Sequence, residues 1–320
     1  MGLEARERRP PTSEELQRPL QDVRARFLAA VRDIRPRLHR FCSRMSGSAL
    51  DGEDLVQETL AQAFYSLTSL KDDTRLEAWL FRIAHNKCVD FARRQRRQWE
   101  DTVPYDDEEL AERLMEDVDY DAEPIDRSLA TFVTGLPAME RACVLLKDVL
   151  DYRLSEVAEI VGSTTGAVKS ALHRGRLKLR RLSHPLAPVE LEPSQRQLLQ
   201  AYIACFNRRD WDGLRRLIQA DARVEVVGEA EFAVLDIGAP YFSNYAALPW
   251  QWRLSLAYVD SEPLIVHWRR VGEQWRPLAA IRLWWRDGKV ARIRDYAHVE
   301  YLLNDARVDV DPQLVDDASP

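Results

Sequence analysis

The chain has 320 residues, of which 46% are hydrophobic and 31% charged, a composition typical of a soluble globular protein with two or three domains. Its net charge of −6 argues against nucleic-acid binding only if the charge is spread evenly, and an acidic block at residues 100–126 offsets two basic segments elsewhere. The four cysteines are far apart, and no apolar run is long enough to cross a bilayer. We therefore expect a cytoplasmic protein with reduced thiols and without a membrane segment, metal site or cofactor.

The N-terminal third is predicted to be helical after a flexible arm at residues 1–19. A helical repeat of apolar residues begins at Val23, and Pro36 lies inside it, which predicts a kink or a break into two helices. The next segment, DGEDLVQETLAQAFYSL (residues 51–67), is predicted as a helix whose apolar residues face inward. Its exposed side carries the polar residues Asp54, Gln57 and Glu58.

Residues 76–97, LEAWLFRIAHNKCVDFARRQRR, are predicted as an amphipathic helix with a basic end. At about 100° per residue the apolar residues fall on one side, while Arg82 and His85 fall on the other. Trp79 lies at the edge of the apolar side, where core packing is favoured over base stacking. Lys87 interrupts the apolar side, so this turn is expected to face solvent or another domain. Four arginines at the end of the helix are suited to binding an anion: Arg93, Arg94, Arg96 and Arg97.

Three segments in this order, HRFCSRMSGS, DGEDLVQET and AWLFRIAHNKCVDFARR, resemble region 2 of bacterial extracytoplasmic-function sigma factors. In that family the acidic helix docks on the clamp helices of core RNA polymerase. The resemblance therefore implies polymerase contacts by Asp54, Leu55, Gln57 and Glu58. The basic helix and the loop before it bind and open the −10 promoter element, where extruding a base costs a few kcal/mol. The implied DNA contacts are Lys71, Arg75, Arg82, Asn86, Arg93, Arg94 and Arg97.

The acidic residues 100–127 are predicted to form a linker. Low hydrophobicity and repulsion between like charges favour an extended chain there. Two roles stay open for this linker. It could mimic nucleic acid in the polymerase channel, or it could serve only as a solubilising tether.

A second helical module is predicted at residues 128–184, and it contains a helix-turn-helix pattern. Gly162 supplies the turn between two amphipathic helices, and GAVKSALHRGR (residues 166–176) resembles region 4 of the same sigma family. The resemblance implies that the second helix reads the −35 element in the major groove. Two positions depart from the family pattern, because Ala171 replaces a usual arginine and Gly175 a usual alanine. The implied DNA contacts are Thr165, Lys169, Ser170, His173, Arg174 and Arg176.

The pattern changes again after residue 188. Two short helices broken near Asp210 precede alternating strands, and Asp287-Gly288 is a hairpin signal. This order is similar to the SnoaL-like, nuclear-transport-factor-like cone, which implies a domain at residues 194–305 and a tail at 306–320. A carboxylate and a tyrosine would suit an isomerase-like site, although a histidine in an alternating strand is more often structural. The candidate pocket residues are Tyr241, His267 and Asp295.

The predicted fold class is thus two all-α domains, with region 2 at residues 20–99 and region 4 at 128–184, followed by an α+β cone with a curved antiparallel sheet. The predicted function is an alternative sigma factor, not an enzyme, that binds core RNA polymerase and promoter DNA. Its C-terminal domain would modulate it in cis, with or without a small-molecule ligand. The alternative is a ligand-sensing helix-turn-helix regulator acting without polymerase, which has no reason to carry residues 51–97. A third interpretation, an enzyme fused to a DNA-binding module, requires turnover that depends on Asp295 or His267.

Overall fold

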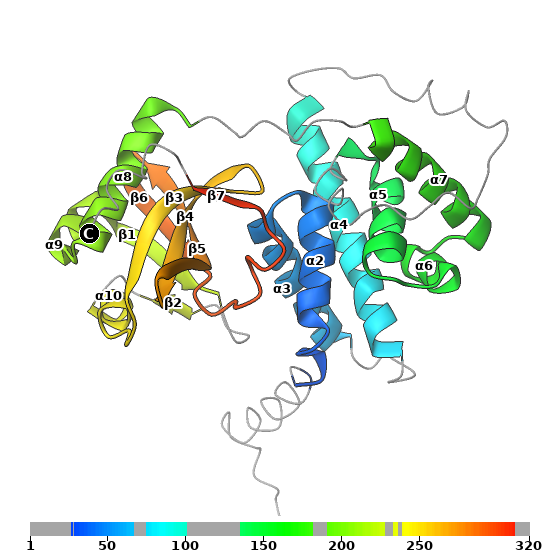
Figure 1. Ribbon diagram of the computed structural model, residues 1–320, viewed down its shortest axis with the longest axis horizontal. Helices are drawn as coiled ribbons and strands as arrows, with labels where there is room; N and C mark the ends of the chain where they lie inside the picture. Colours follow the sequence, from blue (N-terminus) through cyan, green and yellow to red (C-terminus); the bar gives the residue numbers. More distant parts are fainter. Residues whose placement is uncertain are drawn as a thin grey trace, which may run out of the picture.

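The structure is a computed structural model that describes residues 27, 29–66, 75–100, 135–181, 191–227, 233–235 and 239–310. The predicted arm, Lys71, the acidic linker after residue 100 and the tail beyond residue 310 lie outside these residues. For residues 96–100 only the helical backbone is described. The described parts form three bodies in a row, with the first helical module between the second module and the C-terminal domain (Figure 1). The predicted fold class is confirmed, whereas the exact domain boundaries stay a prediction.

The first module consists of α2 (Arg35–Ser46), α3 (Ala49–Tyr65) and α4 (Leu76–Glu100). Pro36 lies in the first turn of α2, where its missing N–H is tolerated, so the predicted interruption falls at the start of this helix. Gly47 ends α2 in the left-handed conformation (φ 85°), and the Ser48 hydroxyl then accepts the Asp51 N–H to cap α3. A Cβ on Gly52 would lie 2.5 Å from Ser43 Cα, so this glycine permits the close contact between α2 and α3.

The second module contains α5 (Ala138–Val144), which continues into the π-helical turn η5 (Leu145–Val149), then α6 (Leu154–Val161) and α7 (Thr165–Arg181). Gly162 adopts φ 69° between α6 and α7, which confirms the predicted helix-turn-helix. A Cβ on Gly175 would lie 2.9 Å from Val144 Cγ2. The residue that replaces the usual alanine of the family therefore allows α7 to approach α5 closely.

The two helical modules share one apolar core. The rings of Phe81 on α4 and Tyr152 before α6 meet edge to face at 5.3 Å, and both residues belong to the joint buried cluster. Arg141 of α5 donates to the Met45 carbonyl at 2.5 Å, so polar contacts also cross this boundary. The two helical modules are therefore closed on one another in this structure.

The C-terminal domain, residues 191–310, places three helices against one face of a seven-stranded sheet. The strand order is β2-β1-β6-β5-β4-β3-β7, and every pair is antiparallel except β1–β6, so the sheet is mixed rather than purely antiparallel. Asp287 and Gly288 both have positive φ, which confirms the predicted hairpin between β5 and β6. The helices are α8 (Pro193–Asn207), α9 (Trp211–Leu217) and α10 (Ala239–Ala246). The strands are β1 (Ile218–Val226), β2 (Ala233–Leu235), β3 (Trp252–Val259), β4 (Glu262–Val271), β5 (Gln274–Arg286), β6 (Lys289–Asp295) and β7 (Val308–Val310).

The opposite face of the sheet is covered by the first helical module. Ala49 and Leu50, at the start of α3, are at most 2% exposed and belong to a buried cluster with residues of β3, β4 and β5. Burying a leucine side chain contributes about 2 kcal/mol. The described part of the chain has no helix with the length and apolarity needed to span a bilayer.

Candidate functional site

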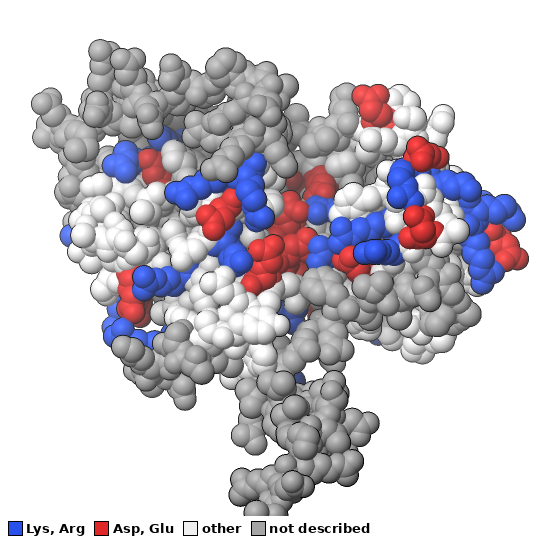
Figure 2. Space-filling model, turned by 180° about the vertical axis from the view of Figure 1, so that it is seen from behind, with Lys and Arg blue, Asp and Glu red and all other residues white. Residues whose placement is uncertain are grey.

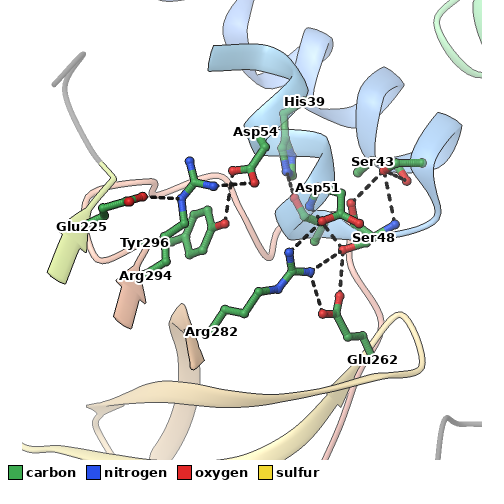
Figure 3. A network of polar contacts seen from close by, with 12 residues as sticks. His39, Ser43, Ser48, Asp51, Asp54, Glu225, Glu262, Arg282, Arg294 and Tyr296 are labelled. Carbon is green, nitrogen blue, oxygen red and sulfur yellow. Dashed lines mark hydrogen bonds and ion pairs between the residues drawn. The ribbon is translucent and has the colours of Figure 1, made fainter. Parts of the chain in front are cut away.

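The N-terminal half of α3 lies against the C-terminal domain, and its carboxylates pair with arginines of the sheet (Figure 3). Arg282 on β5 donates to Asp51 Oδ1 at 2.7 Å and, from its other terminal nitrogen, to Glu262 Oε1 at 2.6 Å. The Ser48 hydroxyl donates to Glu262 Oε2 at 2.8 Å. One guanidinium therefore joins the first turn of α3 to the start of β4.

Asp54, one turn further along α3, makes the second contact of this kind. Arg294 on β6 donates to its Oδ2 at 2.6 Å, and the Tyr296 hydroxyl donates to its Oδ1 at 3.2 Å. The Asp54 side chain is 28% exposed, and the Arg294 side chain is 10% exposed. Burial raises the pKa of Asp54 to about 6, because the loss of water outweighs the attraction of Arg294 and Arg282. Docking therefore makes this carboxylate easier to protonate.

A fully buried carboxylate lies between these two pairs. Glu53 accepts hydrogen bonds from Arg35 of α2 at 2.7 Å, from Gln57 at 2.6 Å and from the Tyr301 hydroxyl of the C-terminal domain at 2.8 Å. Glu53 is not among the residues predicted from the sequence, although it directly precedes Asp54. Its burial depends on Tyr301, 248 residues away along the chain, which no local pattern could indicate.

The interface continues onto α2 with the charges reversed. Arg40 pairs with Asp305 at 2.8 Å, while Arg44 donates to the Asp305 carbonyl and pairs with Asp260 at 3.5 Å. Figure 2 shows the molecule from behind, with acidic side chains gathered in the middle of the face and basic side chains on both sides. The contact between the first module and the C-terminal domain is therefore electrostatically complementary along both helices.

The four residues predicted to contact polymerase differ in their exposure and in their contacts. Asp54 is paired with the sheet, and Gln57 donates to Glu53. Leu55 is 2% exposed within the core of the helical modules, so it supports α3 from inside and is not available to a partner in this structure. Glu58 is exposed and pairs with Lys87 of α4 at 3.5 Å. Lys87 was expected to face solvent or another domain, but it faces α3, where it pairs with Glu58.

The residues predicted to contact the −10 element lie along α4. Arg82, Asn86, Arg93 and Arg94 are exposed, as a DNA-binding surface requires. Arg75 pairs with Glu159 of α6 at 3.0 Å. Lys71 is outside the described residues, and only the backbone of Arg97 is described.

His85 was expected on the exposed side of α4, and this expectation is wrong. The side chain is 7% exposed, one turn after Phe81 on the side of α4 that packs against the second module. Burial lowers the pKa of His85 and favours the neutral imidazole. Helical periodicity of one segment could not reveal that a second module covers this side.

The residues predicted to contact the −35 element lie on α7. Thr165 and Lys169 are exposed, and the Ser170 hydroxyl donates to the Gly166 carbonyl at 3.2 Å. His173 and Arg174 are half-buried, and Arg174 pairs with Glu140 of α5 at 3.0 Å.

Arg176 holds the second module together and is not free to reach DNA. Its side chain is among the buried polar groups, at 8% exposure, and its guanidinium donates to both oxygens of Asp148 at 3.0 and 2.6 Å. Such a bidentate pair ties α7 to the π-helical turn after α5. In this motif Arg174 and Arg176 both pair with carboxylates of the second module, whereas Thr165 and Lys169 are exposed, a difference that sequence spacing alone does not reveal.

The three candidate pocket residues of the C-terminal domain do come together. Asp295 is fully buried, and its Oδ2 accepts hydrogen bonds from the hydroxyls of Tyr241 at 2.8 Å and Tyr245 at 2.5 Å. Its Oδ1 accepts the Ala297 N–H at 2.9 Å. The His267 ring lies 5.3 Å from the Tyr245 ring. The two tyrosine hydrogen bonds join α10 to β6, and burial raises the pKa of the Asp295 carboxyl.

The fold and its surfaces define a helical DNA-binding protein with an acidic docking helix and an added α+β domain. Residues 30–98 match the family model described as Sigma-70 region 2, and residues 126–179 match Sigma-70, region 4. The chain is 32% identical over 288 residues to the ECF RNA polymerase sigma factor SigG of Mycobacterium tuberculosis, covering 81% of this chain and 78% of that protein. The chain belongs to the ECF RNA polymerase sigma factors.

Two solved structures are also similar to the chain. One is the ECF sigma factor SigJ of Mycobacterium tuberculosis, at 18% identity and TM-score 0.32, covering 87% of this chain and 97% of that one. The other is a candidate ketosteroid isomerase from Kribbella flavida, at 21% identity and TM-score 0.26, covering 32% of this chain and 76% of that one. The alignment with SigG covers 81% of the chain, more than residues 1–179 could supply, so it extends into the C-terminal domain.

Replacing Arg176 by Gln is expected to destabilise the second module by about 3–5 kcal/mol, because it leaves Asp148 buried without its charge partner. Urea denaturation followed by circular dichroism measures this loss. The matched control is Arg180→Gln, an exposed position on the same helix, which is expected to change stability by less than about 0.5 kcal/mol. An Arg176→Gln protein of unchanged stability with reduced DNA affinity would contradict the structural role.

Proposed function

We propose that this sigma factor binds core RNA polymerase and promoter DNA in the cytoplasm through its helical modules, and that its C-terminal domain restrains it in cis. One observation carries the proposal. Asp54, which the family resemblance assigns to polymerase docking, is paired with Arg294 of the sheet, and the preceding turn is held by Arg282. Polymerase and the C-terminal domain would then compete for the same face of α3.

The interface has the composition of a reversible contact. Buried ion pairs gain little net free energy, because each charge loses water on docking. The apolar part is small on the α3 side, where Ala49 and Leu50 are the buried hydrophobic residues. A partner that offers α3 comparable arginines and an equal apolar surface could therefore displace the sheet.

A second restraint lies between the two helical modules. The −10 and −35 elements are centred about 25 base pairs apart, which is roughly 85 Å along B-DNA. The longest helix, α4, has 25 residues and spans roughly 38 Å, and the second module packs directly against it. Promoter recognition by both modules therefore requires them to separate, as well as release of α3.

The double replacement Arg282→Glu, Arg294→Glu is expected to release α3, because it places carboxylates opposite Asp51 and Asp54. We expect at least about fivefold tighter binding of core polymerase, equivalent to about 1 kcal/mol, and more run-off transcript from a selected promoter. The control is Arg286→Glu, which breaks a pair with Asp221 inside the C-terminal domain. Equal affinity of the double variant and the unchanged chain would refute restraint through this face.

Docking is also expected to depend on pH through Asp54. Its pKa is about 6 when docked and about 3.9 when free, so docking takes up a proton and strengthens as the pH falls through 6. Between pH 7.5 and 5.5 the two values predict about fourfold tighter docking. His39 acts in the opposite direction, because burial lowers its pKa and its protonation disfavours the buried state.

The pH dependence can be measured on the full chain with a protease site inserted within residues 182–190, between α7 and α8. After cleavage, the fraction of C-terminal domain that stays bound is determined by gel filtration at each pH. The Asp54→Asn protein is expected to lose the strengthening at low pH. The assignment to Asp54 fails if this variant responds to pH as the unchanged chain does.

A further proposal is a small-molecule ligand in the C-terminal domain beside Tyr241, His267 and Asp295. It is supported by His267, which is 2% exposed and whose ring nitrogens have no partner among the described residues. Burial, with Arg209 nearby, lowers the pKa of His267 to about 4, so the neutral ring would suit an uncharged ligand with one donor and one acceptor. We expect native mass spectrometry to detect a retained small molecule that is lost in His267→Leu; an identical mass for both proteins would argue against the ligand.

A further inference from the structure

The end of the sheet remote from α3 is rich in arginine and tryptophan. Glu262, at the start of β4, contacts Ser48 of α3, and Arg270, eight residues later, lies roughly 26 Å along the strand. The strand register brings Trp252 opposite Arg269 and Trp275 opposite Arg270. The α8–α9 turn adds Arg208 and Arg209 to this end. We name the six arginines here the distal arginines: Arg208, Arg209, Arg253, Arg269, Arg270 and Arg276.

Half of the distal arginines stack on tryptophan rings. The guanidinium carbon of Arg209 lies 3.5 Å from the centroid of Trp252. Those of Arg253 and Arg269 lie 4.5 Å from the centroids of Trp275 and Trp250 respectively. Stacking holds the planar guanidinium in place. Nη1 of Arg209 donates to the Phe206 and Asn207 carbonyls at 3.3 and 2.9 Å, so this guanidinium keeps only its remaining N–H groups for an oxyanion.

The turn that carries Arg208 and Arg209 is fixed to this end of the sheet. Asn207 donates to the Leu254 carbonyl at 2.8 Å and accepts the Leu254 N–H at 2.8 Å, which clamps the end of α8 to β3. Arg209 adopts φ 60°, a left-handed conformation that an arginine enters at some cost. The turn therefore presents two exposed arginines, of which Arg209 lies over Trp252.

Charge pairing separates the two ends of the domain. Near α3, Arg282 and Arg294 each bind carboxylates. Among the residues that the structure describes, no distal arginine has a carboxylate partner; the hydrogen bonds of Arg270, for example, go to the Gly272 carbonyl and the Gln251 amide. Glu273 lies in the β4–β5 turn, and Asp210 is engaged in capping α9. By the strand register Arg269 and Arg276 share one face of the sheet, whereas Arg253 and Arg270 lie on the other. The distal arginines therefore place cations without carboxylate partners, among the described residues, on both faces of this end of the sheet.

We propose that the distal arginines bind DNA through its phosphates, so that the third domain is itself a DNA-contacting part of this sigma factor. Stacked guanidiniums present paired donors that match phosphate oxygens, and such charge-assisted hydrogen bonds are stronger than neutral ones. B-DNA carries one negative charge per roughly 1.7 Å, which suits several arginines spread over neighbouring strands and one turn. Contacts to phosphates depend on charge and do not distinguish bases, so we expect this binding to be independent of the DNA sequence.

The test uses the full chain without polymerase, so its failure is separate from failure of the restraint proposal. Binding to a labelled duplex and to a single strand of equal length is followed by fluorescence anisotropy at several salt concentrations. The variant is Arg269→Gln with Arg276→Gln, two exposed residues opposite one another on β4 and β5. The control is Arg215→Gln with Arg286→Gln, which removes equal charge from arginines paired with Asp212 and Asp221.

We expect the variant to bind about five- to tenfold more weakly at low salt. The slope of the logarithm of the DNA-binding constant against the logarithm of the salt concentration should be shallower by about 1.8 on the duplex. If the single strand is the preferred form, the slope should be shallower by about 1.4. The control should bind as the unchanged chain does. Arg208→Gln, on a different element, provides an independent second variant, and thermal melting establishes that all variants are folded.

Three results would overturn the proposal. The first is an unchanged slope for both distal variants, and the second is an equal loss in the paired-arginine control, which would indicate only general electrostatics. The third is unchanged DNA binding together with weaker binding of core polymerase. That result would assign the distal arginines to an acidic protein surface instead.

Discussion

The burial of α3 against the C-terminal sheet is the contact on which the arrangement of the described chain depends. Asp51 and Asp54 meet Arg282 and Arg294 directly, and Leu50 enters the apolar cluster of the sheet between them. One face of a helix cannot be covered by two partners at once. The residues that the family resemblance assigns to polymerase docking are therefore, in this structure, a binding site for the protein's own third domain.

The energetics of this contact favour specificity over strength. The carboxylate of Glu53 is fully buried but reaches three donors from three different elements, so its burial is tolerated only in this arrangement. Asp54 loses water and gains a raised pKa, which weakens its share of the docking at neutral pH. A contact of this kind selects one geometry while adding little net free energy.

The two ends of the sheet use the same residue type for different tasks. Arginines near α3 pair with carboxylates of the chain, whereas three of the distal arginines, Arg209, Arg253 and Arg269, lie on tryptophan rings and have no carboxylate partner among the described residues. In the second module Arg176 is buried and paired with Asp148, whereas Lys169 on the same helix is exposed. Surroundings and not residue type decide which cation is structural.

The sequence by itself determined the helices of both sigma regions, the turn at Gly162, the hairpin at Asp287-Gly288 and the order of the three bodies, because these depend on local periodicity and turn chemistry. Residue types also indicated Tyr241, His267 and Asp295 as candidate pocket residues, but no spacing fixed them in one cavity, and it is the fold that brings the three together. Only the tertiary structure decided which polar residues are available. His85 and Arg176 are buried by neighbours distant in sequence, and the buried Glu53 is held by Arg35 of α2 and by Tyr301 of the third domain. Periodicity marks the face of a helix that meets its own core, but it carries no information about a second domain that covers the other face.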